Sequence, residues 1–216
     1  MIAPSILNAD NMHLSRDIKA AIESGIERFH IDIMDGHFVP NLSYGPELVK
    51  DFKRSFPFTK AEIHLMSNNL DTTLPLFVEA GADILEFHYE ATNKPDYWLD
   101  YLKDHNVRCV MAINPSTPVN KLKPFLNKLD QVLLMTVKPG FGGQKFEEAA
   151  VERLAELQDM IKDENLDLPI EVDGGIDRET LKLTRDAGAK IFVAGSYIFK
   201  NGSIEDQVIK LKKEDK

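Results

Sequence analysis

Residues 17–32 read DIKAAIESGIERFHID, and they contain the unit that repeats along the chain. Apolar residues recur at helical spacing over residues 17–25, and Gly25 stands where the helix would stop. A short β-rich run, residues 28–32, follows directly. Because longer amphipathic segments alternate with short strands in this way along the chain, the sequence predicts an α/β fold.

Eight short β-rich runs are spread over the 216 residues: 2–7, 28–32, 60–64, 84–88, 108–113, 131–137, 169–172 and 191–194. Several are apolar nearly throughout, as strands covered on both faces must be. This alternation fits a closed parallel barrel or an open doubly wound sheet. The number of units, their even spacing and the chain length favour the barrel, and the first strand lacks the Gly-rich turn of a dinucleotide-binding sheet. We therefore expect residues 1–216 to form a single (β/α)8 TIM-barrel domain.

Local signals mark where some helices begin and end. Thr117 followed by Pro118 is typical of a helix start. Gly81 and Gly188 follow Ala-rich helix ends and are typical helix stops. The charged tail, residues 211–216, is expected to fray.

Composition excludes several classes of protein. A formal net charge of -9 gives the chain no polyelectrolyte attraction to nucleic acid and makes it a poor match for an anionic membrane. The single cysteine, Cys109, allows no intrachain disulfide and lies in an apolar run, where we expect a buried thiol. No signal peptide and no apolar stretch of membrane-spanning length is visible. We expect a cytoplasmic enzyme or binding protein without a nucleic-acid or membrane partner.

Polar and sulfur-containing residues stand at the ends of four predicted strands: His30, Asp32 and Met34; His64 and Met66; Met135; and Asp173. Side chains alternate across a strand, so residues of one parity share a face, and barrel enzymes place their active sites at strand ends. Polar groups facing a barrel interior are costly unless they are paired or bind something. Two histidines and two aspartates therefore predict a metal site that suits zinc, iron(II), cobalt or manganese. Each motif alone is more often a hydrogen-bonded structural pair, and the methionines can simply fill core space, so it is the coincidence of all three motifs at the barrel mouth that favours a metal site.

Glycine-rich segments follow the last three predicted strands, at residues 139–144, 173–175 and 195–197. Glycines let the backbone approach a ligand and turn N–H groups toward an anion. A phosphate site built from late loops and a helix N-terminus recurs in this barrel, and it would supply the local positive field that the acidic chain lacks. Any tight turn also uses glycine, so the coincidence of three adjacent loops is what favours a phosphate site.

The sequence resembles the ribulose-phosphate 3-epimerase family, a ribulose-phosphate-binding type of TIM barrel, over essentially the whole chain. The motifs that carry the resemblance are residues 3–7, 30–41, 64–66, 88–90, 114–115, 135–144, 172–176 and 194–196. The blocks at 30–41 and 135–144 are highly specific together. Glu62, Ser67, Val110 and Tyr197 depart from the family's usual pattern, and none of them is one of the four predicted ligands.

The resemblance implies a role for each site residue. One divalent metal ion (zinc, iron(II), manganese or cobalt) would be bound by His30, Asp32, His64 and Asp173. Asp32 and Asp173 would also be the catalytic acid and base. Substrate contacts would come from Ser5 and His64, and the phosphate end would be held by Gly140, Phe141, Gly142, Gly143, Gly174, Gly175, Gly195 and Ser196. The pocket would be lined by Met34, Met66 and Met135.

The implied activity is interconversion of D-ribulose 5-phosphate and D-xylulose 5-phosphate, an isomerase step of the pentose phosphate pathway in carbohydrate metabolism. Epimerisation at C3 removes a proton beside the C2 carbonyl and returns one to the other face, so it needs two groups on opposite sides. Asp32 and Asp173 meet this need. A metal at the C2 oxygen would act as a Lewis acid.

Three alternatives compete with this interpretation. A D-allulose 6-phosphate 3-epimerase would apply the same chemistry to a sugar one carbon longer, although the paired glycines at 142–143 and 174–175 favour a pentulose phosphate. A decarboxylase or aldolase of the same barrel group is expected to carry Asp-x-Lys-x-x-Asp, whereas residues 30–35 read HIDIMD. A barrel that binds sugar phosphates without chemistry would be expected to lack a ligand or carboxylate.

Two further expectations concern the surroundings of the site. The loop at residues 37–46 carries apolar side chains and is predicted to cover the site or to meet a neighbouring subunit, since the resemblance implies a homo-oligomer. His88 and Glu90 share a strand face near the site, and they are expected either to support it or to form a structural pair.

Overall fold

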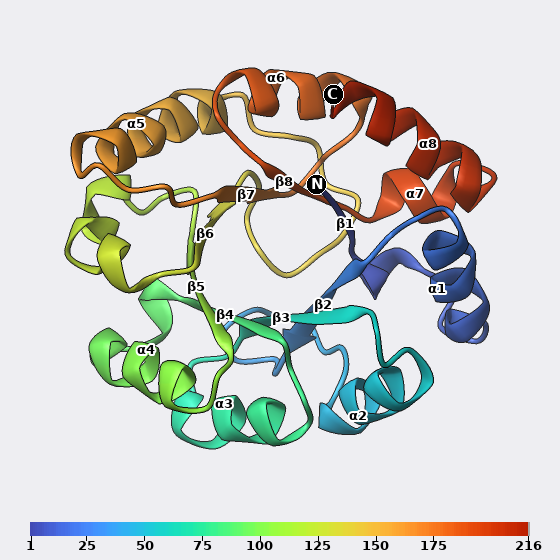
Figure 1. Cartoon of the computed structure of the whole chain (residues 1–216), viewed down its shortest axis with the longest axis horizontal. Coiled ribbons are helices and arrows are strands. Elements are labelled where there is room, and N and C mark those ends of the chain that lie inside the picture. Colours follow the sequence, from blue (N-terminus) through green and yellow to red (C-terminus); the bar gives the residue numbers. More distant parts are fainter. Residues whose placement is uncertain (216) are drawn as a thin grey trace.

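Short parallel strands form the centre of the computed structural model, which describes residues 1–215 (Figure 1). Within that range eight parallel strands follow one another around the sheet: β1 (Ile2–Pro4), β2 (Arg28–Met34), β3 (Lys60–Met66), β4 (Ile84–His88), β5 (Arg108–Ile113), β6 (Gln131–Met135), β7 (Ile170–Asp173) and β8 (Ile191–Ala194). A parallel bridge between Ser5 and His30 joins β1 to β2 and nearly closes the ring. The prediction of a (β/α)8 barrel is confirmed.

Helices surround the sheet on the outside (Figure 1). The α-helices are α1 (Leu14–Glu23), α2 (Pro46–Ser55), α3 (Leu70–Glu79), α4 (Pro95–Asp104), α5 (Ala149–Asp163), α6 (Arg178–Asp186), α7 (Ser196–Lys200) and α8 (Ile204–Glu214). Shorter or tighter turns are η1 (Ile6–Asn8), η2 (Tyr89–Ala91) and η3 (Val119–Lys128). Among the described residues, no helix has the length and apolar character needed to cross a membrane.

Two local expectations differ from the structure. The helix predicted after Thr117 and Pro118 is the 3-10 segment η3, which contains Pro124 and has no side-chain cap, because the Thr117 hydroxyl donates to Glu90 instead. The tail predicted to fray is helical through Glu214, since Leu211 is fully buried and the Glu214 carboxylate accepts from Arg178. Lys216 lies outside the described residues.

Strand parity divides the buried residues into an outer and an inner core. Side chains such as Ile31, Ile63 and Phe87 point outward and pack in the large apolar cluster between sheet and helices. Inside the barrel, Val110 and Leu133 form a small apolar cluster with three neighbours. The rest of the interior is largely polar, which is unusual for a space closed to water.

A charged layer crosses the barrel interior, formed by buried side chains from β2, β3, β4, β6 and β7: Arg28, Glu62, Glu86, Gln131 and Glu171. The Arg28 guanidinium donates to Glu62 and to the Gln131 amide oxygen at 2.7 Å. The Gln131 amide nitrogen donates in turn to Glu86 at 3.3 Å and to Glu171. One cation therefore serves a layer that holds three carboxyl groups.

The three glutamates of this layer differ in charge. Burial raises the pKa of Glu62, but Arg28 outweighs it and holds that pKa well below its usual range. Burial and the neighbouring carboxyl groups raise the pKa of Glu171 to about 8 and that of Glu86 well above its ordinary value. At neutral pH the layer therefore contains a Glu62–Arg28 ion pair beside carboxyl groups that retain their protons.

Replacing Arg28 by methionine should lower the free energy of unfolding by about 3–5 kcal/mol, because the buried Glu62 carboxylate loses the guanidinium that pairs with it. Loss of the cation raises the folded-state pKa of Glu62, so the deficit should be larger at pH 8 than at pH 5.5. Urea denaturation at the two pH values measures this. Arg54→Met, which removes an exposed ion pair, is the control; a deficit equal to the control's would contradict the prediction.

Candidate active site

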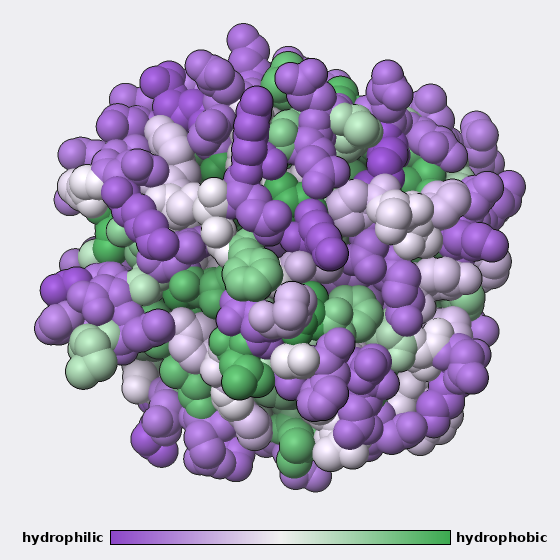
Figure 2. Space-filling view, turned by 180° about the vertical axis from the view of Figure 1, so that it is seen from behind, coloured by the Kyte–Doolittle hydropathy of each residue, from purple (hydrophilic) through white to green (hydrophobic). Residues whose placement is uncertain are grey.

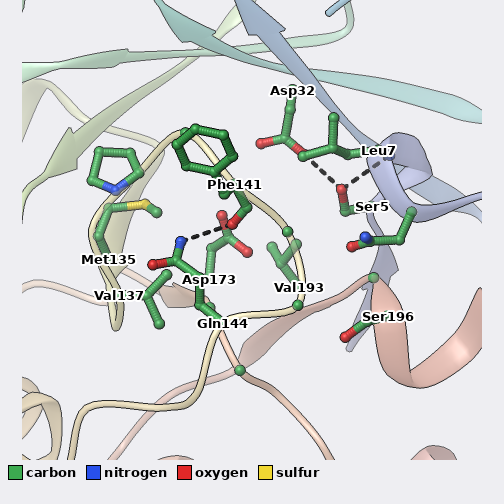
Figure 3. A pocket seen from close by; sticks show the side chains of 18 of the residues that line it. Ser5, Leu7, Asp32, Met135, Val137, Phe141, Gln144, Asp173, Val193 and Ser196 are labelled. Carbon is green, nitrogen blue, oxygen red and sulfur yellow. Dashed lines mark hydrogen bonds between the residues drawn. The ribbon is translucent and has the colours of Figure 1, made fainter. Parts of the chain in front are cut away.

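A pocket opens at the carboxyl ends of the strands, and its lining combines two carboxylates with the late glycine loops (Figure 3). The predicted residues that line it are Ser5, Asp32, Met34, Met66, Met135, Gly140, Phe141, Gly142, Gly143, Asp173, Gly174, Gly175, Gly195 and Ser196. Asp32 comes from β2 and Asp173 from β7, so strands far apart in the sequence place both carboxylates on one pocket. His30 and His64 do not line the pocket; both are fully buried beneath it.

Four side chains meet just below the pocket. His30, Asp32, His64 and Asp173 each contribute one ligand-type atom, and these atoms all lie within 4.8 Å of one another. His30 Nε2 and Asp32 Oδ1 lie 3.2 Å from His64 Nδ1. Asp173 Oδ2 lies 3.9 Å from His64 Nδ1 and 4.0 Å from His30 Nε2. The four predicted ligands are therefore brought together by the fold, although two of them are separated by 143 positions in the sequence.

The two aspartates differ in protonation. The Ser5 hydroxyl donates to Asp32 Oδ2 at 2.6 Å (Figure 3). Asp32 Oδ1 lies 3.2 Å from His64 Nδ1. Burial raises the pKa of Asp32, but His30 and His64 outweigh it and hold that pKa far below its usual range. Burial, opposed by His30, raises the pKa of Asp173 to about 7. Near neutral pH one carboxylate is ionised and the other can hold a proton.

The two histidines use their ring nitrogens differently. His30 directs Nε2 toward the other ligands and Nδ1 toward the charged layer, where Glu62 Oε2 and Glu86 Oε2 each lie 3.6 Å away. Burial opposes a charge on His30, but Asp32 and Glu86 raise its pKa well above the ordinary value. Burial lowers the pKa of His64 to about 4, so this ring is neutral. A neutral imidazole can offer a lone pair to a metal.

A second group of ligand-type atoms lies in the charged layer, formed by His30, Glu62, Glu86 and Glu171. The Arg28 guanidinium already contacts two of these glutamates. A cation is thus supplied there by the chain itself, and the upper group remains the candidate metal centre.

The late glycines allow close backbone packing around the far end of the pocket. Gly175 has a φ of +65°, and a Cβ at this position would overlap the backbone nitrogen of Phe146. A Cβ on Gly195 would overlap the Asn8 side chain, which lines the pocket between two of the glycine loops. These loops and the start of α7 therefore pack closely around one end of the pocket.

The loop at residues 37–46, predicted to cover the site or to meet a neighbouring subunit, packs beside the site, and none of its residues lines the pocket. Val39 packs with Met34 and Met66 on the pocket side, and the Phe38 ring lies 4.7 Å from the His88 ring between centroids. The Asn41 amide donates to the Gly140 carbonyl at 2.8 Å, which ties the loop to the first glycine segment.

Sequence reasoning missed Asn8, Gln144 and the charged layer as parts of the site region. Asn8 follows the first strand by only a few residues, and Gln144 ends the first glycine-rich segment, so their positions in the sequence could have indicated both. In the structure the Gln144 amide donates to two carbonyls of its own loop. The layer had a stronger signal: Arg28, Glu62 and Glu171 each lie two residues before a predicted ligand, on the same strand face.

Comparison with known proteins agrees with this geometry. A sequence model described as the ribulose-phosphate 3 epimerase family matches residues 1–199. The chain belongs to this family. A relative named ribulose-phosphate 3-epimerase from Bacillus subtilis is 42% identical over 92% of this chain and 91% of its own length. Another, from Escherichia coli K12, is 40% identical over 92% of this chain and 88% of its own. The protein is accordingly an isomerase of the epimerase type.

Solved structures extend the comparison to the fold alone. A 3-hexulose-6-phosphate synthase superposes with a TM-score of 0.75 at 15% identity, over 99% of this chain and 98% of its own. A structure titled KGPDC, from Streptococcus mutans, has a TM-score of 0.72 at 19% identity, over 99% and 96%. Identities this low show a shared barrel and say nothing about shared chemistry.

Proposed function

We propose that this epimerase interconverts D-ribulose 5-phosphate and D-xylulose 5-phosphate by proton transfer at C3, with a divalent metal ion held by His30, Asp32, His64 and Asp173. The observation that carries the proposal is the convergence of two carboxylates from different strands on one pocket, directly above two buried imidazoles. Family membership supports the epimerase chemistry, and the relatives' names support the pentulose phosphate.

The four donors fit a metal ion. Bonds of about 2.1 Å in a tetrahedral site would separate neighbouring donor atoms by roughly 3.4 Å. The separations given above run from 3.2 Å to 4.0 Å, so little movement is needed. Nitrogen and carboxylate oxygen donors suit zinc, iron(II), manganese or cobalt. When bound, the ion would act as a Lewis acid and stabilise negative charge on the substrate's C2 oxygen.

Asp32 and Asp173 supply the proton transfers in this proposal. Epimerisation in one direction starts with Asp32 ionised and Asp173 protonated, which is the state that their opposite pKa shifts favour in the metal-free site. The reverse direction starts with the two protonation states exchanged. The Ser5 hydroxyl fixes the orientation of Asp32 through its hydrogen bond. Each carboxylate would face one side of the sugar, so a proton removed by one is replaced by the other.

The glycine loops would hold the phosphate at the opposite end of the pocket. Backbone N–H groups of such loops suit a dianion, and Gly175 leaves room for close packing against Phe146. The relatives compared above are named for ribulose phosphate, so the D-allulose 6-phosphate alternative is not favoured.

We also propose a homo-oligomer in the cytoplasm. Large apolar side chains are exposed on the surface, including Leu42 at 73% and Phe141 at 53%. Figure 2 shows apolar side chains gathered near the middle of the face opposite to that of Figure 1, with hydrophilic residues around them. Burial of such side chains against a second copy is a common reason for their exposure in a single chain.

The first test follows solvent deuterium entering C3 of D-ribulose 5-phosphate by NMR, with metal-loaded and chelated protein compared. We expect exchange and D-xylulose 5-phosphate formation with the loaded protein, and loss of both on chelation, since the charge on the C2 oxygen is no longer stabilised. D-allulose 6-phosphate serves as the comparison substrate. Faster exchange on the hexulose would reassign the substrate to D-allulose 6-phosphate. Activity that survives full chelation would contradict the proposed role of the metal.

Asp173→Asn should separate exchange from epimerisation. The amide keeps an oxygen for the metal but cannot carry the second proton, so epimerisation should fall by about 10²–10⁴-fold. Asp32 can still remove and return a proton on its own face, so one of the two sugars should keep exchanging its C3 proton without changing configuration. The control is Asp51→Asn on exposed helix α2. Epimerisation at the control's rate would contradict the two-carboxylate mechanism.

Gly175→Ala should weaken binding of the phosphate end, because the added methyl group overlaps the Phe146 backbone and the residue has positive φ. We expect the KM for the ketose phosphate to rise by about tenfold or more, as expected when a binding loop is displaced. Gly45→Ala is a matched control, since an added Cβ there meets nothing within 4 Å and φ is −113°. Equal KM values for the two variants would argue against a phosphate site at these loops.

A further inference from the structure

His88 lies next to the candidate metal centre without belonging to it. Its side chain is fully buried, and its Nε2 lies 2.8 Å from His64 Nε2. The opposite nitrogen of His64, Nδ1, is the one that faces Asp32 and His30. His64 is therefore held between the ligand group on one side and a second imidazole on the other.

A metal bound to His64 would determine which ring nitrogen of His64 and of His88 carries the proton. Binding through the Nδ1 lone pair requires the His64 proton to be on Nε2, where it can only be donated to His88 Nε2. His88 must then accept at Nε2 and carry its own proton on Nδ1. The reverse arrangement, in which His88 donates to His64, would put a proton on His64 Nδ1 and block the metal.

Glu90 is placed to select the first arrangement. His88 Nδ1 makes no hydrogen bond among the residues that the structure describes, and Glu90 Oε2 lies 3.4 Å from it. A carboxylate at that position can only accept, so it favours a proton on His88 Nδ1. Burial raises the pKa of Glu90, but the nearby His88 ring and the hydrogen bond from Thr117 outweigh it and hold the pKa below its usual value, so the group is ionised.

The outer end of this contact chain is anchored. Glu90 Oε1 accepts from the Asn114 backbone N–H at 2.9 Å and from the Thr117 hydroxyl. The Arg153 guanidinium, from α5, donates to the carbonyls of Asn114 at 2.8 Å and Thr117 at 3.1 Å. It also donates to Met135 at the end of β6. Glu90 is thus held by the segment after β5, which the Arg153 guanidinium joins to the end of β6.

We propose that His88 and Glu90 are positioning residues that hold the His64 imidazole as the tautomer and in the orientation needed to bind the metal. The proposal rests on the metal site of the proposed function. A carboxylate–imidazole–imidazole chain acts on the ligand and not on the substrate, so its effect falls on metal affinity. Partners of this kind typically change metal affinity by about 10–100-fold when they are removed.

The test measures zinc and cobalt affinity of the full-length protein by competition with a chelator of known affinity. His88→Phe removes the acceptor for His64, and Glu90→Gln removes the charge that orients His88. We expect the metal Kd to rise by about 10–100-fold for His88→Phe and by a smaller factor for Glu90→Gln. His88→Gln, whose amide oxygen can still accept from His64, should recover part of the loss. His105→Phe, at the end of α4, is the control and should bind metal as the parent does.

Two further readouts separate positioning from folding. At saturating metal kcat should return to within a few fold of the parent and KM should not change, because neither residue touches the pocket. Nitrogen-15 NMR of the zinc-loaded parent should show protons on His64 Nε2 and His88 Nδ1. Glu90→Gln should show a mixture of His88 tautomers, and it should fold even if His88→Phe does not, since its carboxylate is 22% exposed.

The outcomes distinguish this proposal from the one on which it rests. A parent protein that binds no divalent metal, or that works equally well when chelated, would overturn the proposed metal site. Tight metal binding by the parent together with a Kd within twofold for both Glu90→Gln and His88→Gln, and unchanged His88 tautomers in Glu90→Gln, would overturn the positioning role alone.

Discussion

Closure of the parallel sheet forces every second strand residue into a space without water, and the polar chemistry of this protein depends on how those residues are paired. In the charged layer, the buried carboxyl groups are paired with one guanidinium and one amide, and only Glu62 among them is firmly ionised. A buried charge without a partner would cost several kcal/mol, so this layer is a condition for placing ionisable groups above it.

The four predicted ligands above the charged layer are also buried polar groups with partners, but chemically identical side chains among them have different surroundings. Each candidate imidazole has one nitrogen toward the shared ligand group and the other in a separate polar network. For His30 that network is the glutamate layer, where Glu62 and Glu86 each lie 3.6 Å from Nδ1. For His64 it is the His88 imidazole, and burial keeps the His64 ring neutral. The pKa values of the carboxylates Asp32 and Asp173 are likewise shifted in opposite directions by their surroundings. In the proposed mechanism the acid and base roles follow from these surroundings, since the two side chains are chemically identical.

Much of this could be predicted from the sequence because it depends on local rules. Strand parity placed His30, Asp32 and Met34 on one face, and the run of eight short strands indicated the barrel. The same parity applied to Arg28 and Glu62 would have revealed the charged layer, but their register across strands could not be predicted. The helix expected after Pro118 became a 3-10 segment because Thr117 serves Glu90, a contact between residues 27 positions apart.

The sequence alone determined the alternation of strands and helices, the strand face on which the predicted ligands lie and, through its motifs, the family. These follow from periodicity and residue chemistry, which act over a few positions. Only the tertiary structure decided that Asp173 lies within 4.0 Å of His30, that Arg28 is shared by Glu62 and Glu171, and that His64 is held by His88. Those contacts depend on barrel closure and strand stagger, which are properties of the whole sheet and of no single segment.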